Sequence, residues 1–177
     1  MSIKPPKRIT AERLHNIALH YLDRFSSSKE NLRRVLMRRV QKSEKFHGED
    51  EGTGAALAAA EIARLEKAGL LDDAAYAEMK TRSLRQRGAS SRMIRLKLAQ
   101  KGVKADDTDT AMEEASGEGG GEKEAARIFA RKRKIGPFRP EGGRAENRAK
   151  DLSTLARAGF SYDVARDVVD AESPEPV

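Results

Sequence analysis

The stretch that decides the fold is Arg82-Ser-Leu-Arg-Gln-Arg-Gly-Ala-Ser-Ser-Arg-Met-Ile-Arg-Leu-Lys-Leu-Ala-Gln-Lys-Gly-Val-Lys104. It contains eight basic residues and no acidic one. Gly88 and Gly102 interrupt it on either side of a short amphipathic segment, in which Ile94 and Leu98 lie one helical turn apart. This pattern predicts two helices joined by a tight turn, and their basic surface suits a polyanionic partner.

Basic and acidic blocks alternate along the whole chain. Their net charges are +8 for residues 1–46, −5 for 47–81, +8 for 82–104, −7 for 105–124, +7 for 125–150 and −4 for 151–177, within a total of +7. Three basic blocks separated by acidic ones suggest three modules that each offer a positive surface. The acidic blocks would keep the chain from binding every polyanion indiscriminately.

The composition disfavours one large hydrophobic core. Of the 177 residues, 38% are hydrophobic and 36% are charged, whereas globular proteins average about 45–50% and about 25%. Several thin helical units fit these values better. The chain has no cysteine, which excludes disulfides and thiolate chemistry and suits a reducing compartment. Apolar runs are too short for a membrane span or a signal peptide, so we expect a soluble cytoplasmic protein.

Helical periodicity dominates the N-terminal third. An apolar stripe at i, i+3, i+4 spacing predicts a first helix, and it comprises Leu14, Ile17, Ala18, Tyr21, Leu22 and Phe25. Ser27-x-x-Glu30 is typical of a capping box that begins a second helix. The acidic, glycine-containing residues 48–54 predict a loop, and a third helix is expected to end at Gly69.

The remaining elements are also predicted to be helical. Asp72 or Asp73 is expected to cap a fourth helix that runs to about Gly88, and Ser90 or Ser91 a fifth that stops at Gly102. Further helices are predicted at 108–115, 122–134, 145–158 and 161–171, with a glycine-rich linker at 117–121. Strand signals are nearly absent.

A weak internal repeat relates three of the helix junctions. In each, a small residue ends one helix, a serine begins the next, and an apolar-Arg pair or its equivalent follows, so that Arg33, Arg95 and Arg166 fall at matching positions. We therefore expect an all-α fold, an elongated array of three tandem three-helix repeats. The predicted repeats span residues 10–69, 70–116 and 122–172, with flexible ends at 1–9 and 173–177.

Across residues 10–170 the chain resembles the RecX family, bacterial regulators of the recombinase RecA. The resemblance lies in Leu71-Asp72-Asp73-Ala74-Ala75-Tyr76-Ala77, Arg82, Gly88, Ser91-Arg92-Met93-Ile94-Arg95-x-x-Leu98 and Lys101-Gly102-Val103, and in Gly159-Phe160-Ser161-Tyr162 near the C-terminus. It implies an all-α protein of three tandem repeats that binds the RecA filament on single-stranded DNA. It also implies inhibition of RecA ATP hydrolysis, strand exchange and coprotease activity, and so a role in DNA repair and the SOS response, without a cofactor.

Two sets of residues are candidates for this role. The expected partner-binding residues, which would contact the RecA filament or DNA, are Arg82, Arg85, Arg92, Arg95, Lys97 and Lys101. The expected structural residues of the family motif are Leu71, Asp72, Asp73, Tyr76, Ala77, Gly88, Ile94, Leu98 and Gly102. For the two aspartates, helix capping is favoured over a metal or catalytic site, because adjacent residues at a helix start point in different directions.

The main alternative is a stand-alone DNA-binding protein of the helix-turn-helix type. The basic hairpin has a suitable length, but its second helix offers only Gln100 for reading bases. His15, His20 and His47 share no metal-ligand spacing, and no nucleophile–base pair or phosphate-binding loop is present. We therefore expect no enzyme activity, metal, cofactor or membrane contact, and a monomeric chain.

Overall fold

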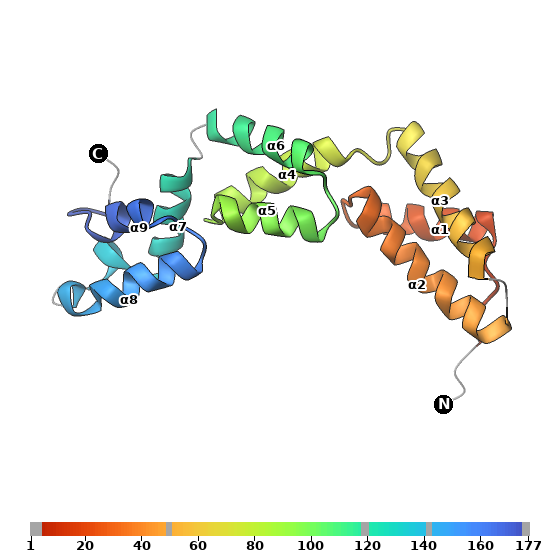
Figure 1. Ribbon diagram of the computed structural model, residues 1–177, viewed down its shortest axis with the longest axis horizontal. Coiled ribbons are helices and arrows are strands. Elements are labelled where there is room, and N and C mark those ends of the chain that lie inside the picture. The colour runs from red at the N-terminus through yellow and green to blue at the C-terminus, as the bar shows by residue number, and fades with distance from the viewer. Residues whose placement is uncertain (1–4, 49–50, 118–120, 141–142, 175–177) are drawn as a thin grey trace. The chain divides into compact units, whose positions relative to one another are not determined.

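The computed structural model describes residues 5–48, 51–117, 121–140 and 143–174. Within these ranges it contains nine α-helices, one short 3-10 helix and no strand, which confirms the predicted all-α class (Figure 1). Two units can be distinguished: the first comprises the described residues up to Tyr76 together with Lys101–Val103, and the second comprises Ala77–Gln100 and the described residues from Lys104 onward.

The core of the first unit forms between three helices, α1 (Ala11–Leu22), α2 (Lys29–His47) and α3 (Glu51–Lys67). α3 packs against α2 and α1, and Figure 1 shows α2 and α3 side by side. The buried apolar side chains here are Leu14, Ala18, Leu32, Leu36, Val40, Ala58, Leu65 and Leu71. The stripe predicted for the first helix faces this core except for Phe25, which is exposed because α1 ends before it.

The predicted loop at residues 48–54 is largely wrong, because α3 already begins at Glu51. Residues 49 and 50 lie outside the described residues. Gly48 ends α2 in the left-handed conformation, with φ of 65°. Gly54 lies inside α3 where a Cβ would collide with the Val40 side chain. Gly54 therefore allows α2 and α3 to pack closely. In the sequence, the same glycine suggests a loop.

The N-terminus of α2 differs by one residue from the predicted capping box. Ser28, not Ser27, is the N-cap, and its Oγ accepts a hydrogen bond from the Asn31 amide at 3.2 Å. Glu30 turns to Arg33 and Arg34 instead of to the backbone. Its hydrogen bond with Arg33 outweighs desolvation and, with Arg34, lowers the pKa of Glu30 to about 2.

Three helices follow: α4 (Asp73–Gln86), α5 (Ser91–Gln100) and α6 (Ala105–Gly117). Asp72 caps α4, since its Oδ1 accepts from the Ala75 amide at 3.0 Å. Ser90 caps α5 by accepting from the Met93 amide at 3.2 Å. α6 begins at Ala105, three residues before the predicted start, with two aspartates in its first turn. Gly117 ends α6, and most of the predicted linker lies outside the described residues.

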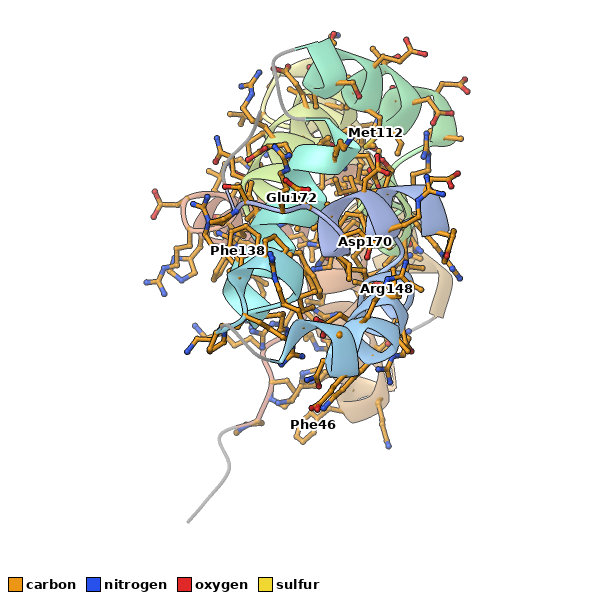
Figure 2. All side chains as sticks on the ribbon, turned by 90° about the vertical axis from the view of Figure 1, so that its left-hand side faces the viewer. Phe46, Met112, Phe138, Arg148, Asp170 and Glu172 are labelled. Carbon is orange, nitrogen blue, oxygen red and sulfur yellow. The ribbon has the colours of Figure 1, made fainter. Side chains whose placement is uncertain are left out.

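The last part of the chain folds into α7 (Glu122–Arg133), the 3-10 helix η1 (Gly136–Phe138), α8 (Arg144–Arg157) and α9 (Tyr162–Val169). α9 packs against α7 and α8 over a core of small and apolar side chains. The buried Asp151 accepts hydrogen bonds from Arg139 at 2.7 Å and from the Gly136 amide at 3.0 Å. Figure 2 labels a second link, in which Arg148 of α8 pairs with Asp170 at 2.7 Å.

Candidate polyanion-binding groove

The six basic residues predicted to bind a partner do not form one surface. Arg85 is only 5% exposed. Its guanidinium contacts Glu122 at 2.6 Å and the carbonyl oxygen of Ala89 at 3.3 Å, and it also donates to Ser91. Glu122 in turn accepts from the Ser91 amide at 3.0 Å. Arg85 thus joins α4 to the start of α7, and we leave it out of the candidate site.

Three other residues of that set already have polar contacts. Arg82 pairs with Glu78 at 2.8 Å and Arg95 with Asp109 at 3.2 Å, both with exposed side chains. Exposed pairs of this kind contribute little to stability, so an anionic partner can replace the carboxylate at small cost. Lys101 belongs to the first unit, where its Nζ donates to Asn31 at 2.9 Å.

Arg92 and Lys97 are exposed, and neither side chain forms a hydrogen bond or ion pair within the ranges that the structure describes. Arg92 packs its stem over Gly159. Lys97 lines an open groove of about 490 Å³ in the second unit. We call this cavity the basic groove; its full lining is Leu84, Arg87, Gly88, Ala89, Ser90, Met93, Lys97, Phe129, Arg133, Thr154, Arg157 and Ala158.

The basic groove combines positive charge with an apolar floor. Four separate segments each supply one cation, namely Arg87 just after α4, Lys97 of α5, Arg133 of α7 and Arg157 of α8. No carboxylate is among the described residues that line it. Leu84, Met93 and Phe129 provide the apolar part. Cations in a concave site raise the local positive potential and attract anionic groups.

Local contacts hold the cations in place. The Lys132 ammonium donates to the Arg87 carbonyl at 3.0 Å, which fixes the chain where α4 ends. The Arg133 guanidinium lies over the Phe129 ring, 5.8 Å from its centroid. Arg157 donates to the Ser153 carbonyl at 3.3 Å, one turn back along α8. Arg87, Arg133 and Arg157 therefore each form a contact that helps to hold the residue in place.

Two glycines allow the walls of the groove to approach each other. Gly88 has φ of 82°, and a Cβ there would lie 2.7 Å from the Phe129 amide nitrogen. Gly159 has φ of 94°, and a Cβ there would lie 2.6 Å from the Ser90 hydroxyl, which donates to the Ala158 carbonyl at 2.7 Å. Both positions exclude larger residues by conformation and by contact. The second and third predicted repeats thus pack directly against one another within the second unit.

The residues expected to be structural lie in the core, at helix starts or at close contacts between segments. Leu71, Tyr76, Ala77, Ile94 and Leu98 are buried. Asp73 does not cap its own helix: its Oδ1 accepts from the Lys29 amide at 2.8 Å, at the first residue of α2. Gly102 has φ of 74°, and a Cβ there would collide with the Glu30 side chain. Sequence patterning predicts the burial of the apolar residues. It does not predict the contact of Asp73, because Lys29 is 44 residues away along the chain.

The structure adds three cations that the sequence analysis did not select. Arg87 belongs to the quoted basic stretch, but the helical pattern gives it no special position. Arg133 stands within Arg131-Lys132-Arg133-Lys134, where basic residues cover every side of the helix. Arg157 is an isolated arginine with no sequence signal at all. Only packing of four helical segments identifies them as one set.

The described residues offer no candidate for two other kinds of feature, a metal site and a membrane span. Within the described residues, no group of three or more histidine, cysteine, aspartate or glutamate side chains is placed to hold a metal ion. None of the described helices combines the length and the apolar character needed to cross a bilayer.

Comparison with known proteins identifies relatives of this chain. Residues 72–112 match the family model described as RecX, second three-helix domain. A regulatory protein RecX of Myxococcus xanthus (strain DK1622) is 48% identical over 169 residues, which cover 95% of this chain and 90% of that protein. The regulatory protein RecX of Agrobacterium fabrum (strain C58) is 35% identical over 170 residues, covering 95% and 87%.

The fold agrees with this assignment. A crystal structure of regulatory protein RecX superimposes with a TM-score of 0.65 over 91% of this chain and 72% of that one, at 22% sequence identity. Three-helix domains are the building unit named by the matching family model, in agreement with the repeat organisation predicted from the sequence. The chain therefore belongs to the RecX family of regulatory proteins.

Proposed function

We propose that this protein binds RecA filaments on single-stranded DNA and inhibits RecA ATP hydrolysis, and with it strand exchange and coprotease activity. Family membership supports a regulatory role. The observation that carries the proposal further is the basic groove, in which Arg87, Lys97, Arg133 and Arg157 surround an apolar floor without a carboxylate. Such a site suits a polyanionic partner, either DNA in the filament or an acidic surface of RecA.

The groove suits contact with an assembled partner better than catalysis. Its cations are guanidinium and ammonium groups, which bind phosphate or carboxylate but do not transfer protons readily near neutral pH. Arg92 lies beside the groove on α5, and we include it in the proposed contact surface. Arg82 and Arg95 would join it by exchanging their exposed carboxylate partners for groups on the filament.

Binding as a monomer at several points along one filament would add weak contacts through effective concentration. Each contact then needs only modest affinity, which fits a shallow and highly charged groove. The acidic blocks between the basic ones would limit binding to unrelated polyanions. Inhibition is therefore expected to persist at near-physiological salt, where purely electrostatic DNA binding falls steeply.

The test is RecA ATP hydrolysis on single-stranded DNA, with the purified full-length protein titrated in at near-physiological salt. The proposal predicts inhibition at concentrations well below that of RecA protomers. Binding to one duplex sequence over scrambled DNA, with no effect on RecA, would instead favour the helix-turn-helix alternative. Absence of both effects would contradict the proposed function.

A further inference from the structure

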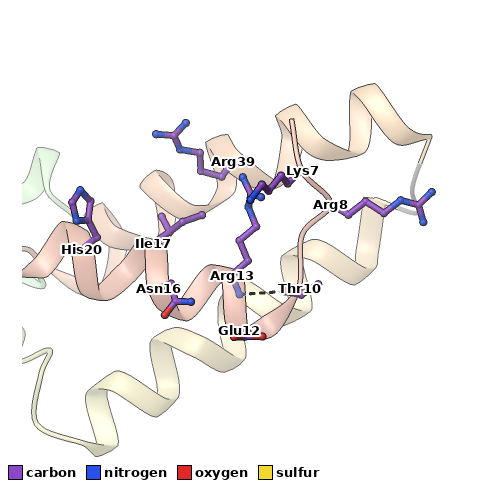
Figure 3. A pocket seen from close by; sticks show the side chains of 9 residues that line it. All are labelled: Lys7, Arg8, Thr10, Glu12, Arg13, Asn16, Ile17, His20 and Arg39. Carbon is purple, nitrogen blue, oxygen red and sulfur yellow. Dashed lines mark hydrogen bonds between the residues drawn. The ribbon is translucent and has the colours of Figure 1, made fainter. Parts of the chain in front are cut away.

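A second basic cavity lies in the first unit, beside the N-terminal half of α1. It has a volume of about 710 Å³ (Figure 3), and its lining is Lys7, Arg8, Thr10, Glu12, Arg13, Asn16, Ile17 and His20, with Arg39 of α2. We call it the N-terminal pocket. It shares no residue with the basic groove, and the proposed function does not use it.

The segment that borders the N-terminal pocket is hydrogen-bonded to α2. The Nε2 atom of His47 lies 2.8 Å from the Pro6 carbonyl oxygen, and the Ser43 hydroxyl donates to the Lys7 carbonyl at 3.4 Å. Thr10 then caps α1 by accepting from the Arg13 amide at 3.2 Å. Residues on both sides of the pocket are thereby held before any ligand arrives, which lowers the entropic cost of binding.

Positive side chains converge inside this pocket. Arg13, Ile17 and His20 follow one face of α1, because they are spaced at i, i+4 and i+7. Figure 3 shows the Arg13 side chain extending toward Lys7, with Arg39 of α2 on the same side of α1. Glu12 is the one carboxylate in the lining, and it lies on the opposite side of α1 from the Arg13 guanidinium.

Within the described residues, Lys7, Arg13 and Arg39 have no counter-charge. The Nε atom of Arg13 is buried and has no hydrogen-bond partner within the described residues. The side chains of Lys7 and Arg39 likewise form no ion pair in that part of the chain. A buried donor without a partner costs free energy, and three neighbouring cations repel one another. An anion in the pocket would remove both costs at once.

We propose that the N-terminal pocket binds a phosphate-bearing anion of several negative charges, the chemistry offered by a nucleoside polyphosphate or by the backbone of a nucleic acid. Guanidinium groups contact phosphate oxygens in a bidentate manner, and the Lys7 ammonium adds a point charge. The volume falls within the range of about 300–1,000 Å³ of small-molecule sites. Ile17 and Asn16 add an apolar wall and an amide for the rest of such a ligand.

The experiment is isothermal titration calorimetry on the full-length protein at constant ionic strength. The probes are inorganic tripolyphosphate, ATP and a single-stranded oligonucleotide without a terminal phosphate. The test variant is Arg13→Gln with Arg39→Gln. The matched control is Lys104→Gln with Lys150→Gln, which makes the same change in net charge at exposed sites that line neither cavity.

The proposal predicts that the test variant binds tripolyphosphate at least about tenfold more weakly, the effect of about 1.4 kcal/mol, while the control stays within about twofold of the original protein. An equal loss for ATP identifies free nucleotides as the source of the phosphate. A matching loss for the oligonucleotide, beside the loss for tripolyphosphate, identifies nucleic-acid phosphates. Unchanged affinity for all three probes, or equal losses in test and control variants, overturns the proposal.

A further variant keeps the test valid if the double substitution impairs folding. Lys7 and Arg39 are exposed, so Lys7→Gln with Arg39→Gln leaves the half-buried Arg13 side chain in place. Far-ultraviolet circular dichroism verifies that this variant retains its helices. The same tenfold loss of tripolyphosphate binding is expected, and failure to see it in a folded variant contradicts the proposal. RecA inhibition is expected to survive in this variant, which separates the pocket from the basic groove.

Discussion

The contact between Arg85 and Glu122 provides a quantitative test of how the groove is held together. Arg85 of α4 is almost fully buried, and Glu122 at the start of α7 is its only carboxylate partner within the described residues. Replacing Glu122 by alanine would leave the guanidinium buried without a counter-charge. It would also remove the acceptor for the amide and the hydroxyl of Ser91. We expect the second unit to lose stability as a result.

The size of that loss follows from burial. Removing one partner of a buried ion pair typically costs about 3–5 kcal/mol. The Glu122 side chain retains 27% exposure while that of Arg85 retains 6%, so water already weakens the pair on one side. We therefore expect a decrease of about 2–3 kcal/mol in the free energy of unfolding. In a chain of this size that corresponds to about 2–4 °C in melting temperature for each kcal/mol.

Urea denaturation followed by circular dichroism measures this loss. Glu124→Ala is the matched control, because Glu124 is exposed in the same first turn of α7 and shares its favourable interaction with the helix dipole. The control should change stability by no more than about 0.5–1 kcal/mol. A double-mutant cycle with Arg85→Met should show coupling above about 1 kcal/mol. If Glu122→Ala is as stable as the control, the assignment of Arg85 to a structural role is refuted.

Two further predictions concern residues that shape the second unit. Gly88→Ala should destabilise the protein by more than about 2 kcal/mol, because left-handed strain of about 1–2 kcal/mol adds to the collision with Phe129. Gly69 has φ of 72° and open space around it, so Gly69→Ala should show the strain alone. Equal melting temperatures for the two variants would contradict the close packing at Gly88. Burial by itself would raise the pKa of Asp151, but hydrogen bonds from Arg139 and the Gly136 amide outweigh it and hold that pKa below its usual value. Its contribution is therefore complete above the unfolded-state pKa of about 4 and is lost as pH falls toward the lower folded-state pKa. Asp151→Asn should then cost about 2 kcal/mol at pH 7 and clearly less at pH 3 in urea titrations, and a gap that does not change with pH would count against this interpretation.

Local sequence signals predicted most of the helices. Apolar periodicity, serine and aspartate caps, and glycines after helix ends depend on neighbours within a few residues, so they can be recognised without the fold. The errors are also local in origin. Ser27 and Ser28 are equally good caps by sequence and both are buried, but the Ser28 hydroxyl also donates to the Lys101 carbonyl, which lies far away along the chain. Gly54 resembles a loop residue until Val40 is seen packed against it.

The candidate site was predicted less well, for a physical reason. A run of basic residues gives charge but not direction, so Arg85 and Lys97 are equivalent in the sequence although one is buried and the other exposed. The basic groove requires side chains from four segments between residues 84 and 158. Arg157 in particular becomes a candidate only because α8 packs near α5. The expected repeat boundaries and the assignment of individual contact residues stay predictions.

The most direct test of the central claim compares two charge-reversed variants in the RecA ATP hydrolysis assay on single-stranded DNA. Lys97→Glu with Arg157→Glu changes two exposed cations of the basic groove, and Lys104→Glu with Lys150→Glu makes the same net change at exposed sites outside it. The account predicts that the groove variant needs at least about tenfold more protein for half-maximal inhibition, while the other variant inhibits like the original protein. Equal inhibition by both variants, with both shown to be folded, would contradict it.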